Sequence, residues 1–457
     1  MFNVRSFGAV GDGQTLDRDA IQSALNACAR AGGGEVYLPA GTYLSGTLEI
    51  PSHTVLNISP GATLLGSPRI EDYTRDPRGR DGDQTGYHLL RVADAGNVVI
   101  CGGGTVDGQG PTYWDSPAKP VDGKSPWRGY HLAYSPHDAR PSPMLTVYKC
   151  QDVRIENLTL TNSAGWAVNT VLSRWLWVRG VKILNPMNGP NTDGIDIQSC
   201  QDMFISDCHI ENGDDSIVAF TSPGSGPCER LAITNCILST RCCAIKFYNW
   251  GEPYAFRQIT CNNIVVYNTE RAFGAYMRDQ SVLQDVVCSN FTVHGGCTPP
   301  NFSERQIHID VANPPEGADD EENSYLASLQ GITFANWIIR SSGRIIVGGN
   351  RRVPVRNLAF HNILLEVNGS QDMASFVNPT PSTGQWNRTL PHIRTIPAHL
   401  VIHAVRGLTV DGVRVANASS QPLQPMHGMY LENVEDDRIN GFSTYPLQPG
   451  CEQIVRK

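Results

Sequence analysis

The chain has 457 residues, with 44 glycines, 30 prolines and only 18% charged residues, a balance typical of strands and turns rather than of a helix-rich protein. The formal net charge of −8 argues against a nucleic-acid partner, because phosphate binding needs a basic surface. The sequence has no apolar run of about 18 residues or more, so no membrane-spanning helix is predicted.

The N-terminal segment predicts a capped first coil. Its start, MFNVRSFGAVGDG, lacks a charged n-region and a long apolar h-region, so a cytoplasmic location is expected unless a signal was trimmed. The stretch DRDAIQSALNACARAGGG predicts a helix, because Asp17 or Asp19 can cap it and Ile21, Leu25 and Cys28 fall on one face. GGGEVYLPAGTYLSGTLEI then predicts two short strands.

The stretch from Thr112 to Ser142 is rich in Pro, Gly and Trp and is too long for a plain turn. Long ordered loops of this kind often shape sites.

An internal repeat follows, in which a cysteine and two polar residues precede an apolar alternation. The copies are CQDVRIENLTL from Cys150, CQDMFISDCHI from Cys200, CERLAITNCIL from Cys228, CNNIVVYNT from Cys261 and CSNFTVHGG from Cys288. SRWLWVRGVKI from Ser173 fits with Ser in the Cys place, and looser copies start at Val355 and Val405. Such strands cannot bury a face alone, but stacked coils can.

The sequence therefore predicts an all-β fold, a single right-handed parallel β-helix with a short N-terminal capping helix. We expect one domain over residues 1–457, with the cap at about 1–50, coils at about 51–420 and a tail at about 421–457. The cysteines should be buried free thiols that form a small inward ladder, since single cysteines on stacked strands supply packing and no metal geometry.

Clustered carboxylates are the main chemical signal. NTDGIDIQSC, residues 191–200, and NGDDSIVAF, residues 212–220, place Asp193 about one coil before Asp214 and Asp215. The two segments should stack about 4.8 Å apart, and a corner at Gly213 would let the carboxylates face one groove. Crowded like charges raise the pKa of one and leave the others ionised, which supplies the acid and base of glycoside hydrolysis.

Two other interpretations of these residues stay open at this point. Asp clusters on a β-helix can bind calcium through oxygen ligands. Asp and Asn side chains can also simply cap turns.

These two segments, together with FGAVGDG, GGGTVDGQG and NSAGWAVN, resemble glycoside hydrolase family 28, the polygalacturonase family, from about residue 3 to about residue 370. The resemblance implies a parallel β-helix that hydrolyses pectic α-glycosidic bonds with inversion and needs no cofactor; no metal site is predicted. It implies that Asp214 protonates the leaving oxygen while Asp193 and Asp215 activate water, and it favours catalysis over calcium.

The match then fails where the family reads its sugar. In place of its Gly-His-Gly segment stands STRCCAIKF, with Arg241 near the His position and Lys246 where a small residue is usual. In place of its Arg-Ile-Lys stands FGAYMRDQS, whose Tyr276 and Arg278 share a face, with Arg278 in the Lys place. The predicted substrate-binding residues are Asn191, Arg241, Lys246, Tyr248, Trp250, Tyr276 and Arg278.

Other residues carry weaker signals. Tyr248 and Trp250 fit sugar stacking and loop packing equally well. His308 and Asp310, in HID, are expected to form a satisfied polar pair rather than a site.

The function expected from the sequence is exo-acting hydrolysis of pectin-derived or other acidic oligosaccharides, with the oligosaccharide as partner and no nucleic acid or membrane. One alternative is a polysaccharide lyase of the same fold, with Arg241 or Lys246 as base and often calcium. Another is a non-catalytic carbohydrate-binding β-helix, which would have no reason to keep three clustered carboxylates. The sugar, its linkage and the oligomeric state are not predicted.

Overall fold

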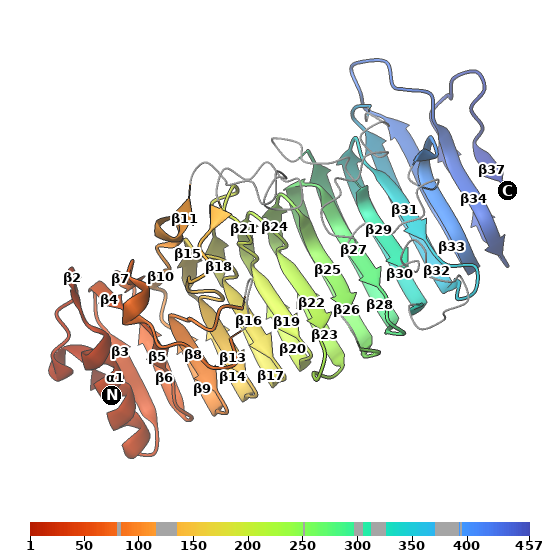
Figure 1. Cartoon of the computed structure of the whole chain (residues 1–457). Coiled ribbons are helices and arrows are strands. Elements are labelled where there is room, and N and C mark those ends of the chain that lie inside the picture. The colour runs from red at the N-terminus through yellow and green to blue at the C-terminus, as the bar shows by residue number, and fades with distance from the viewer. Residues whose placement is uncertain are drawn as a thin grey trace. The chain divides into compact units, whose positions relative to one another are not determined.

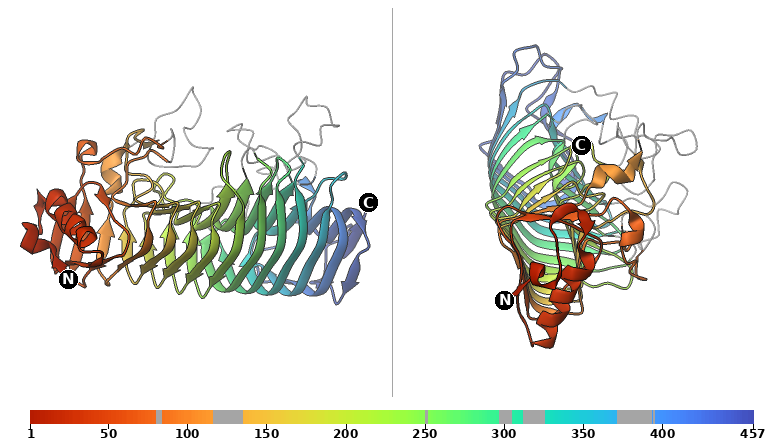
Figure 2. Two further views of the ribbon diagram at one scale, coloured as in Figure 1. Left: turned by 90° about the horizontal axis from the view of Figure 1, so that it is seen from below. Right: turned by 90° about the vertical axis from the view of Figure 1, so that its left-hand side faces the viewer.

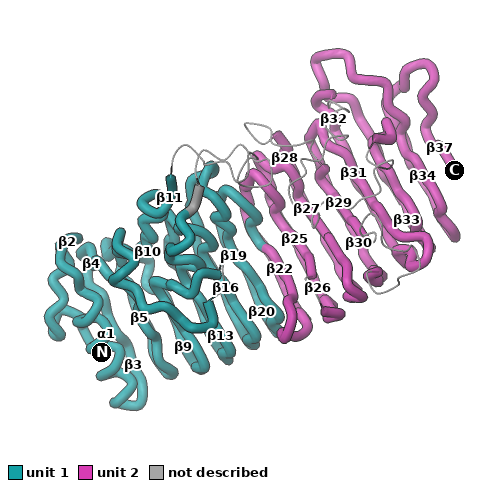
Figure 3. Tube along the Cα trace, in the orientation of Figure 1, with its two compact units in different colours: residues 1–127, 131–217 teal, residues 128–130, 218–457 magenta. Residues whose placement is uncertain are grey.

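The computed structural model describes residues 1–79, 84–115, 135–249, 252–296, 305–311, 326–370, 393 and 395–457. Trp250 and most of the Thr112–Ser142 stretch lie outside these residues. Contacts divide the chain into two compact units; among the described residues the first ends at Ile217 and the second begins at Val218 (Figure 3). The expected single domain over residues 1–457 stays a prediction.

The first unit is built from three parallel ladders, to which each coil contributes one short strand (Figure 1). The first ladder is β1 (Phe2–Asn3), β3 (Gly34–Leu38), β6 (Thr54–Ile58), β9 (Gly96–Cys101), β14 (Gln151–Glu156), β17 (Arg174–Arg179) and β20 (Gln201–Ser206). The second is β2 (Asp12–Leu16), β4 (Gly41–Ser45), β7 (Ala62–Gly66), β10 (Thr105–Asp107), β15 (Thr159–Thr161), β18 (Lys182–Leu184) and β21 (His209–Asn212). The third is β5 (Leu48–Glu49), β8 (Leu90–Ala93), β13 (Leu145–Tyr148), β16 (Val168–Val171) and β19 (Ile195–Gln198).

Only a few elements of the first unit stand outside the ladders. β11 (Trp114–Asp115) and β12 (Ser135–Pro136) form an antiparallel pair. The helical elements are η1 (Val4–Phe7), α1 (Arg18–Arg30), η2 (Ile70–Asp72) and η3 (Gly110–Tyr113).

In the second unit, several strands are longer, because one strand covers two sides of a coil. The short ones are β22 (Ile217–Thr221), β23 (Cys228–Thr234), β24 (Ile237–Thr240), β25 (Cys243–Asn249), β27 (Arg271–Met277), β29 (Arg305–Val311) and β31 (Arg344–Gly348). The long ones are β26 (Ala255–Thr269), β28 (Val282–Gly295), β30 (Ser328–Ser341), β32 (Val355–Val367) and β33 (Ala398–Asn417). The last are β34 (His427–Glu435), β35 (Arg438–Asn440), β36 (Ser443–Thr444) and β37 (Ile454–Arg456).

Strand alternation sets which side chains fill the coils. Val153, Leu176 and Met203 are register partners on β14, β17 and β20, and all three are buried. Residues between such positions point outward, as the period of two requires. Each coil therefore buries its apolar face only against its neighbours, as the sequence predicts.

The N-terminal helix forms as predicted. α1 buries Ile21, Leu25 and Cys28 and packs against β1, β3 and β5 (Figure 2). Asp17 is the N-cap residue, but its carboxylate accepts hydrogen bonds from the amides of Val10 and Gly11, at 2.7 and 2.9 Å, rather than capping the helix. The acid thus ties the first turn of the chain to the helix that covers the first coil.

The predicted cysteine ladder is only partly correct. All cysteines of the described residues are free thiols. In the first unit, Ser173 accepts a hydrogen bond from the Cys150 amide, which places Ser in the Cys column as expected. In the second unit, however, Cys228 pairs with Phe256 and Cys261 pairs with Ile233, five residues further along β23. Inward positions accept either a thiol or a larger apolar group, so the cysteines do not mark one column.

Asparagines form a ladder on the second unit. Asn290 accepts a hydrogen bond from Asn336, which accepts one from Asn362, at 3.0 and 2.9 Å. All three residues have left-handed backbone, with φ of 58°, 58° and 50°. Asn tolerates this conformation better than most residues, and its side chain can bond along the stack.

Strand pairing continues past residue 420, where the sequence predicts a tail. β34 pairs in parallel with β33, and β37 pairs with β34. No helix in the described part of the chain is long and apolar enough to cross a membrane.

Two variants of Asn336 should separate the contribution of the ladder hydrogen bonds from that of the left-handed backbone. We expect Asn336→Ala to lower the free energy of unfolding by about 1–3 kcal/mol, because it loses ladder bonds and places alanine, which tolerates left-handed backbone less well than asparagine, at this position. Asn336→Gly should cost about 1 kcal/mol less, because glycine adopts that backbone freely. Urea unfolding of both variants measures the difference. No loss in either variant would contradict a stabilising ladder.

Candidate active site

The predicted stacking of the carboxylate segments is present in the first unit. The Gly194 amide donates to the Asp215 carbonyl, and the Ile195 amide donates to the Ser216 carbonyl, each at 2.9 Å. In a parallel ladder these two bonds place Asp193 beside Asp215 on adjacent coils. Both acids are buried, with 5% and 2% of their surface exposed.

The turn before β22 is shaped by an asparagine that the sequence analysis did not single out. Asn212 is fully buried, and its Nδ2 donates to the carbonyl oxygens of Asp214 and Asp215, at 2.6 and 2.9 Å. Its Oδ1 accepts from the Ser216 hydroxyl at 2.8 Å. Asn212 therefore caps the turn through its side chain, and the Asp214 carboxylate accepts a further hydrogen bond within it. The sequence signal is an asparagine two residues before the pair of acids, in NGDD.

Gly213 is required by close approach to the preceding coil. Its amide donates to the Thr192 hydroxyl at 3.0 Å. A Cβ on Gly213 would lie 2.4 Å from the Gly189 carbonyl oxygen and 2.8 Å from Thr192 Oγ1. The glycine thus permits the corner by its lack of a side chain, which refines the role expected for it.

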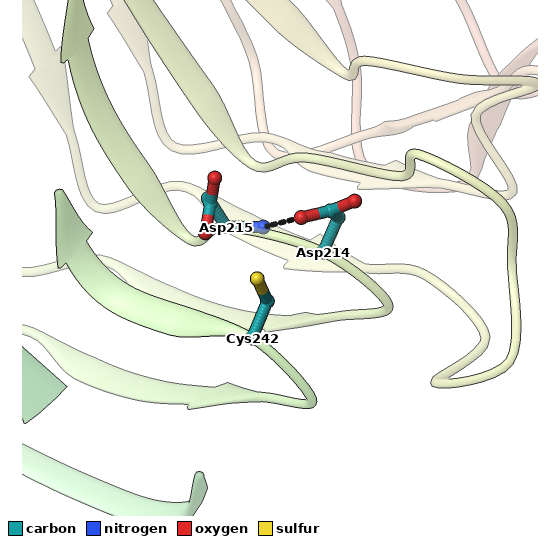
Figure 4. Close-up of side chains that lie close together, drawn as sticks. All are labelled: Asp214, Asp215 and Cys242. Atoms are coloured by element: carbon teal, nitrogen blue, oxygen red, sulfur yellow. Dashed lines mark hydrogen bonds between the residues drawn. The ribbon is translucent and has the colours of Figure 1, made fainter. Parts of the chain in front are cut away.

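Asp214 and Asp215 differ in burial, and a hydrogen bond joins the Asp214 carboxylate to the Asp215 amide (Figure 4). Asp214 is half-buried, and its Oδ1 accepts from the Asp215 amide at 2.9 Å, whereas Asp215 is almost fully buried. A carboxylate oxygen of each lies within 4.8 Å of the other. Two acids this close favour a state in which one of them is protonated.

A buried polar pair on the third ladder was also missed. Asp196 and Asn169 are register partners on β19 and β16, only 1% and 2% exposed, and Asn169 Nδ2 donates to the Asp196 carbonyl at 3.3 Å. On the same side of β19, Gln198 accepts from Gln84 at 3.0 Å. The signal was the alternation in IDIQ, which turns these polar residues away from the apolar interior.

In the second unit, Lys246 and Tyr248 share the outward side of β25. Ile245 and Phe247 point inward and are buried, as their alternation predicts. Lys246 is 5% exposed, its Nζ lies 4.9 Å from the Tyr248 ring centroid, and Tyr248 stacks on Phe220 with centroids 5.2 Å apart. Phe220 therefore covers one face of the Tyr248 ring and holds the tyrosine in place.

Tyr276 belongs to a buried polar group on the next strands. Its hydroxyl accepts from Arg271 Nη1 at 2.7 Å and lies 3.1 Å from His308 Nδ1. Burial raises the pKa of Tyr276 to about 12, so the hydroxyl stays protonated. His308 thus has a polar partner, as expected for HID, but that partner is Tyr276. A Cβ on Gly274 would lie 2.8 Å from the Tyr276 ring, so this glycine makes room for it.

Arg278 is held by its own unit. Its Nε lies 3.2 Å from the Asp279 carboxylate and donates to the Asn249 carbonyl at 3.3 Å, while its amide donates to Asn249 Oδ1 at 2.8 Å. Only 12% of its side chain is exposed. Arg278 is therefore a positioned cation, and Asn249 is the residue that positions it.

The predicted site residues fall into two sets. Asn191, Asp193, Asp214 and Asp215 belong to the first unit, and Arg241, Lys246, Tyr248, Tyr276 and Arg278 belong to the second. Asn191 and Arg241 are both buried, at 5% and 3% exposed, and Asn191 has left-handed backbone. That the second set lines a groove beside Asp214 stays a prediction.

The carboxylates also offer the oxygen ligands that calcium prefers. The chemistry of the set fits either a cation or proton transfer, so the donor atoms alone do not choose between them. Two buried acids beside a half-exposed one also suit water activation next to a proton donor.

Comparisons with known proteins show which proteins the chain is similar to. Residues 28–240 match the model of glycosyl hydrolases family 28. A probable polygalacturonase from Vitis vinifera is 37% identical over 222 residues, which are 46% of this chain and 42% of that protein. The chain spans about half the length of the curated relatives it matches.

Solved structures agree on the fold. The family 28 exopolygalacturonase of Yersinia enterocolitica has a TM-score of 0.68 at 19% identity, covering 96% of this chain and 78% of that one. A hyperthermoactive exopolygalacturonase from Thermotoga maritima has a TM-score of 0.61 at 23% identity, covering 80% and 86%. The fold is the predicted right-handed parallel β-helix, and residues 28–240 of the chain are similar to glycosyl hydrolases family 28.

Proposed function

We propose that this protein is a glycosidase that hydrolyses pectin-derived or other acidic oligosaccharides from a chain end. The observation that carries the proposal is the stack of Asp193 beside Asp215 next to the half-exposed Asp214. Three acids in one corner supply both partners of glycoside hydrolysis, a proton donor and a base.

Asp214 is the proposed general acid. It is the most exposed of the three acids, so it is the one that a glycosidic oxygen can reach. Its proton passes to the leaving oxygen as the bond to the anomeric carbon breaks. Asp193 and Asp215 accept a proton from water, whose oxygen forms the new bond to that carbon.

The family resemblance implies hydrolysis with inversion at the anomeric carbon. The separation of the Asp214 and Asp215 carboxylates departs from the one usual for that mechanism. Oxygens of Asp214 and Asp215 approach within 4.8 Å, whereas inverting enzymes generally separate their two carboxyl groups by about 6.5–9.5 Å. The third carboxylate offsets this difference, because Asp193 and Asp215 together can hold the water. The configuration of the first product tests this point directly.

The substrate class rests on the cations of the second unit. Lys246 and Arg278 are both held in position, with 5% of Lys246 and 12% of the Arg278 side chain exposed, in a chain of net charge −8. A uronate carboxylate is the group that such cations bind, and an aromatic ring such as Tyr248 packs against sugar carbons. Exo action is supported by the names of the Yersinia and Thermotoga proteins, both exopolygalacturonases.

A lyase on the same fold is the second candidate. It would abstract a proton beside a uronate with Arg241 or Lys246 as base and would use calcium to acidify that proton. Both cations are buried at 3% and 5% exposure, and a buried lysine can act as a base when its pKa falls. The two reactions differ in their products, since only the lyase forms an unsaturated sugar.

Asp214→Asn should abolish turnover while keeping the fold and sugar binding. The proton donor supplies about 10²–10⁴ of the rate, and the amide fills the same volume without adding charge. Initial rates on oligogalacturonides and a thermal melt measure the two effects. Asp12→Asn, at an exposed acid of the first unit, is the matched control and should keep full activity. A variant with more than a tenth of wild-type turnover on its true substrate would exclude Asp214 as the acid.

Activity should survive exhaustive chelation, because an inverting hydrolase needs only water, an acid and a base. The product, followed by NMR during the first turnovers, should be saturated and of inverted configuration. Loss of activity that calcium restores, together with an unsaturated product, would instead establish the lyase. A saturated product of retained configuration would overturn the roles given to Asp193 and Asp215.

Arg278→Ala should raise KM for an acidic oligosaccharide by about 10- to 150-fold, the value of a charge-assisted bond of about 1.5–3 kcal/mol. A neutral analogue with the carboxylates reduced should lose much less. Arg257→Ala, which removes an arginine paired with Glu229 elsewhere in the same unit, is the matched control. Equal losses on charged and neutral sugars would show that Arg278 is structural.

A further inference from the structure

An exposed aromatic strip crosses the first ladder of the first unit. Trp177 and Phe204 are register partners on β17 and β20, and their rings stack with centroids 5.6 Å apart and planes 12° from parallel. Phe204 is 44% exposed, and Trp175, two residues before Trp177 on β17, is 42% exposed. Clustered aromatic surface of this kind on a folded protein marks a binding site more often than single exposed residues do.

Trp175 occupies a position that disfavours it. The residues between register partners on β9, β14, β17 and β20 all have left-handed backbone, with φ between 54° and 56°. The other three coils place Asn97, Asp152 and Asp202 there, which are residue types that tolerate this conformation. A bulky tryptophan is strained at such a φ, and exposure of its ring returns little burial energy.

Cations accompany these rings. The Arg174 guanidinium lies 4.8 Å from the Trp175 ring centroid, and the Arg154 guanidinium lies 5.0 Å from that of Trp177. Gln151 Oε1 accepts from Arg174 Nε and Nη2, at 3.1 and 2.7 Å, and so fixes the guanidinium over the ring. The Arg174 guanidinium is thus already held in one orientation, which lowers the entropy cost of binding an anion.

A hollow of about 530 Å³ adjoins the strip, where turns join the third ladder to the first. It is lined by Asp94, Asn97, Lys149, Gln151, Leu172 and Arg174. Among the described residues, Lys149 and Arg174 have no carboxylate partner, whereas Asp94 and Asp152 lie 3.8 and 3.4 Å from Arg78 and Arg154. The hollow therefore offers two cations for an external anion.

We propose that the hollow and the aromatic strip form a second, non-catalytic site that binds an acidic polysaccharide chain. Lys149 and Arg174 bind uronate carboxylates, while Trp175, Trp177 and Phe204 pack against the apolar faces of the sugar rings. The acidic ligand class rests on the proposed function, but the site rests on its own residues. It would hold polymer on the enzyme between cleavage events.

The site is separate from the carboxylate corner. Asp193 lies just before β19, and Ser199 lies just after it. Ser199 is the position one coil beyond Leu172, which lines the hollow. At about 3.3 Å per residue, the strand holds the two sites about 20 Å apart along the third ladder. A variant of Trp175 therefore leaves the catalytic acids untouched.

The test uses polygalacturonate in the Asp214→Asn background, so that polymer is bound without being consumed. We expect Trp175→Asn to weaken polymer binding about 3- to 10-fold in affinity electrophoresis and titration calorimetry. Its melting temperature should be equal or higher, because Asn suits the left-handed backbone. Arg174→Gln should weaken binding of polygalacturonate but not of a neutral galactan.

Controls separate this proposal from the catalytic one. Ile338→Ala and Arg406→Gln, at an exposed apolar residue and an exposed cation of the second unit, should leave binding unchanged. With an active Asp214, Trp175→Asn should keep wild-type kinetics on short oligosaccharides, and binding can be measured even if no hydrolysis is found. Unchanged polymer binding in Trp175→Asn would overturn the proposal. So would a fall in melting temperature, or a shift from dimer to monomer in sedimentation that shows the strip to be an interface between copies.

Discussion

The register of the parallel ladder is the constraint on which the rest of the site depends. Two amide-to-carbonyl bonds, from Gly194 and Ile195 to the coil that follows, set Asp193 beside Asp215. Because the side-chain period of a strand is two, a slip of one residue would turn Asp196 into the interior and Ile197 out of it, and would move Asp193 away from Asp215. The apolar residues that alternate with the acids make such a slip costly. Core packing and the placing of the carboxylates are therefore one requirement.

Residues without large side chains let the coils come close enough for chemistry. Gly194 faces the Ser216 carbonyl, where a Cβ would lie 2.4 Å away, and Gly213 faces the Gly189 carbonyl at the same distance. In the second unit Gly274 leaves space for the Tyr276 ring. A larger residue at any of these positions would push a backbone segment away, and the acids or the buried tyrosine would move with it.

The sequence predicted those features that repeat. The α1 face, the inward alternation of Ile245 and Phe247, and the one-coil offset of Asp193 all follow from periodicity alone. The predicted cysteine column was wrong at Cys261, which pairs with Ile233. An inward position requires an apolar volume rather than a thiol, so the cysteines alone do not give the register of the strands. Asn212 and Asn249 were missed for a related reason. Their roles depend on hydrogen bonds to particular backbone groups, which no spacing reveals.

The third ladder gives the two proposed sites a common physical basis. Its strands are short, and β8, β13, β16 and β19 are each followed directly by a residue with left-handed backbone, namely Asp94, Lys149, Leu172 and Ser199. The corner before β19 carries an acid that stacks on the next coil, whereas the corners after β13 and β16 carry Lys149 and Arg174. The acid that stacks on the next coil thus lies at the start of β19, whereas the two cations of the hollow lie at the opposite end of the ladder, beside Asp94. A polymer with one carboxylate per sugar is repelled by the first corner unless its acid is protonated or its charge is paired, and it is attracted to the second. When the hollow holds one part of the polymer, the next segment reaches the catalytic acids at a raised local concentration. Weak binding at Lys149 and Arg174 would therefore offset the repulsion at the acids.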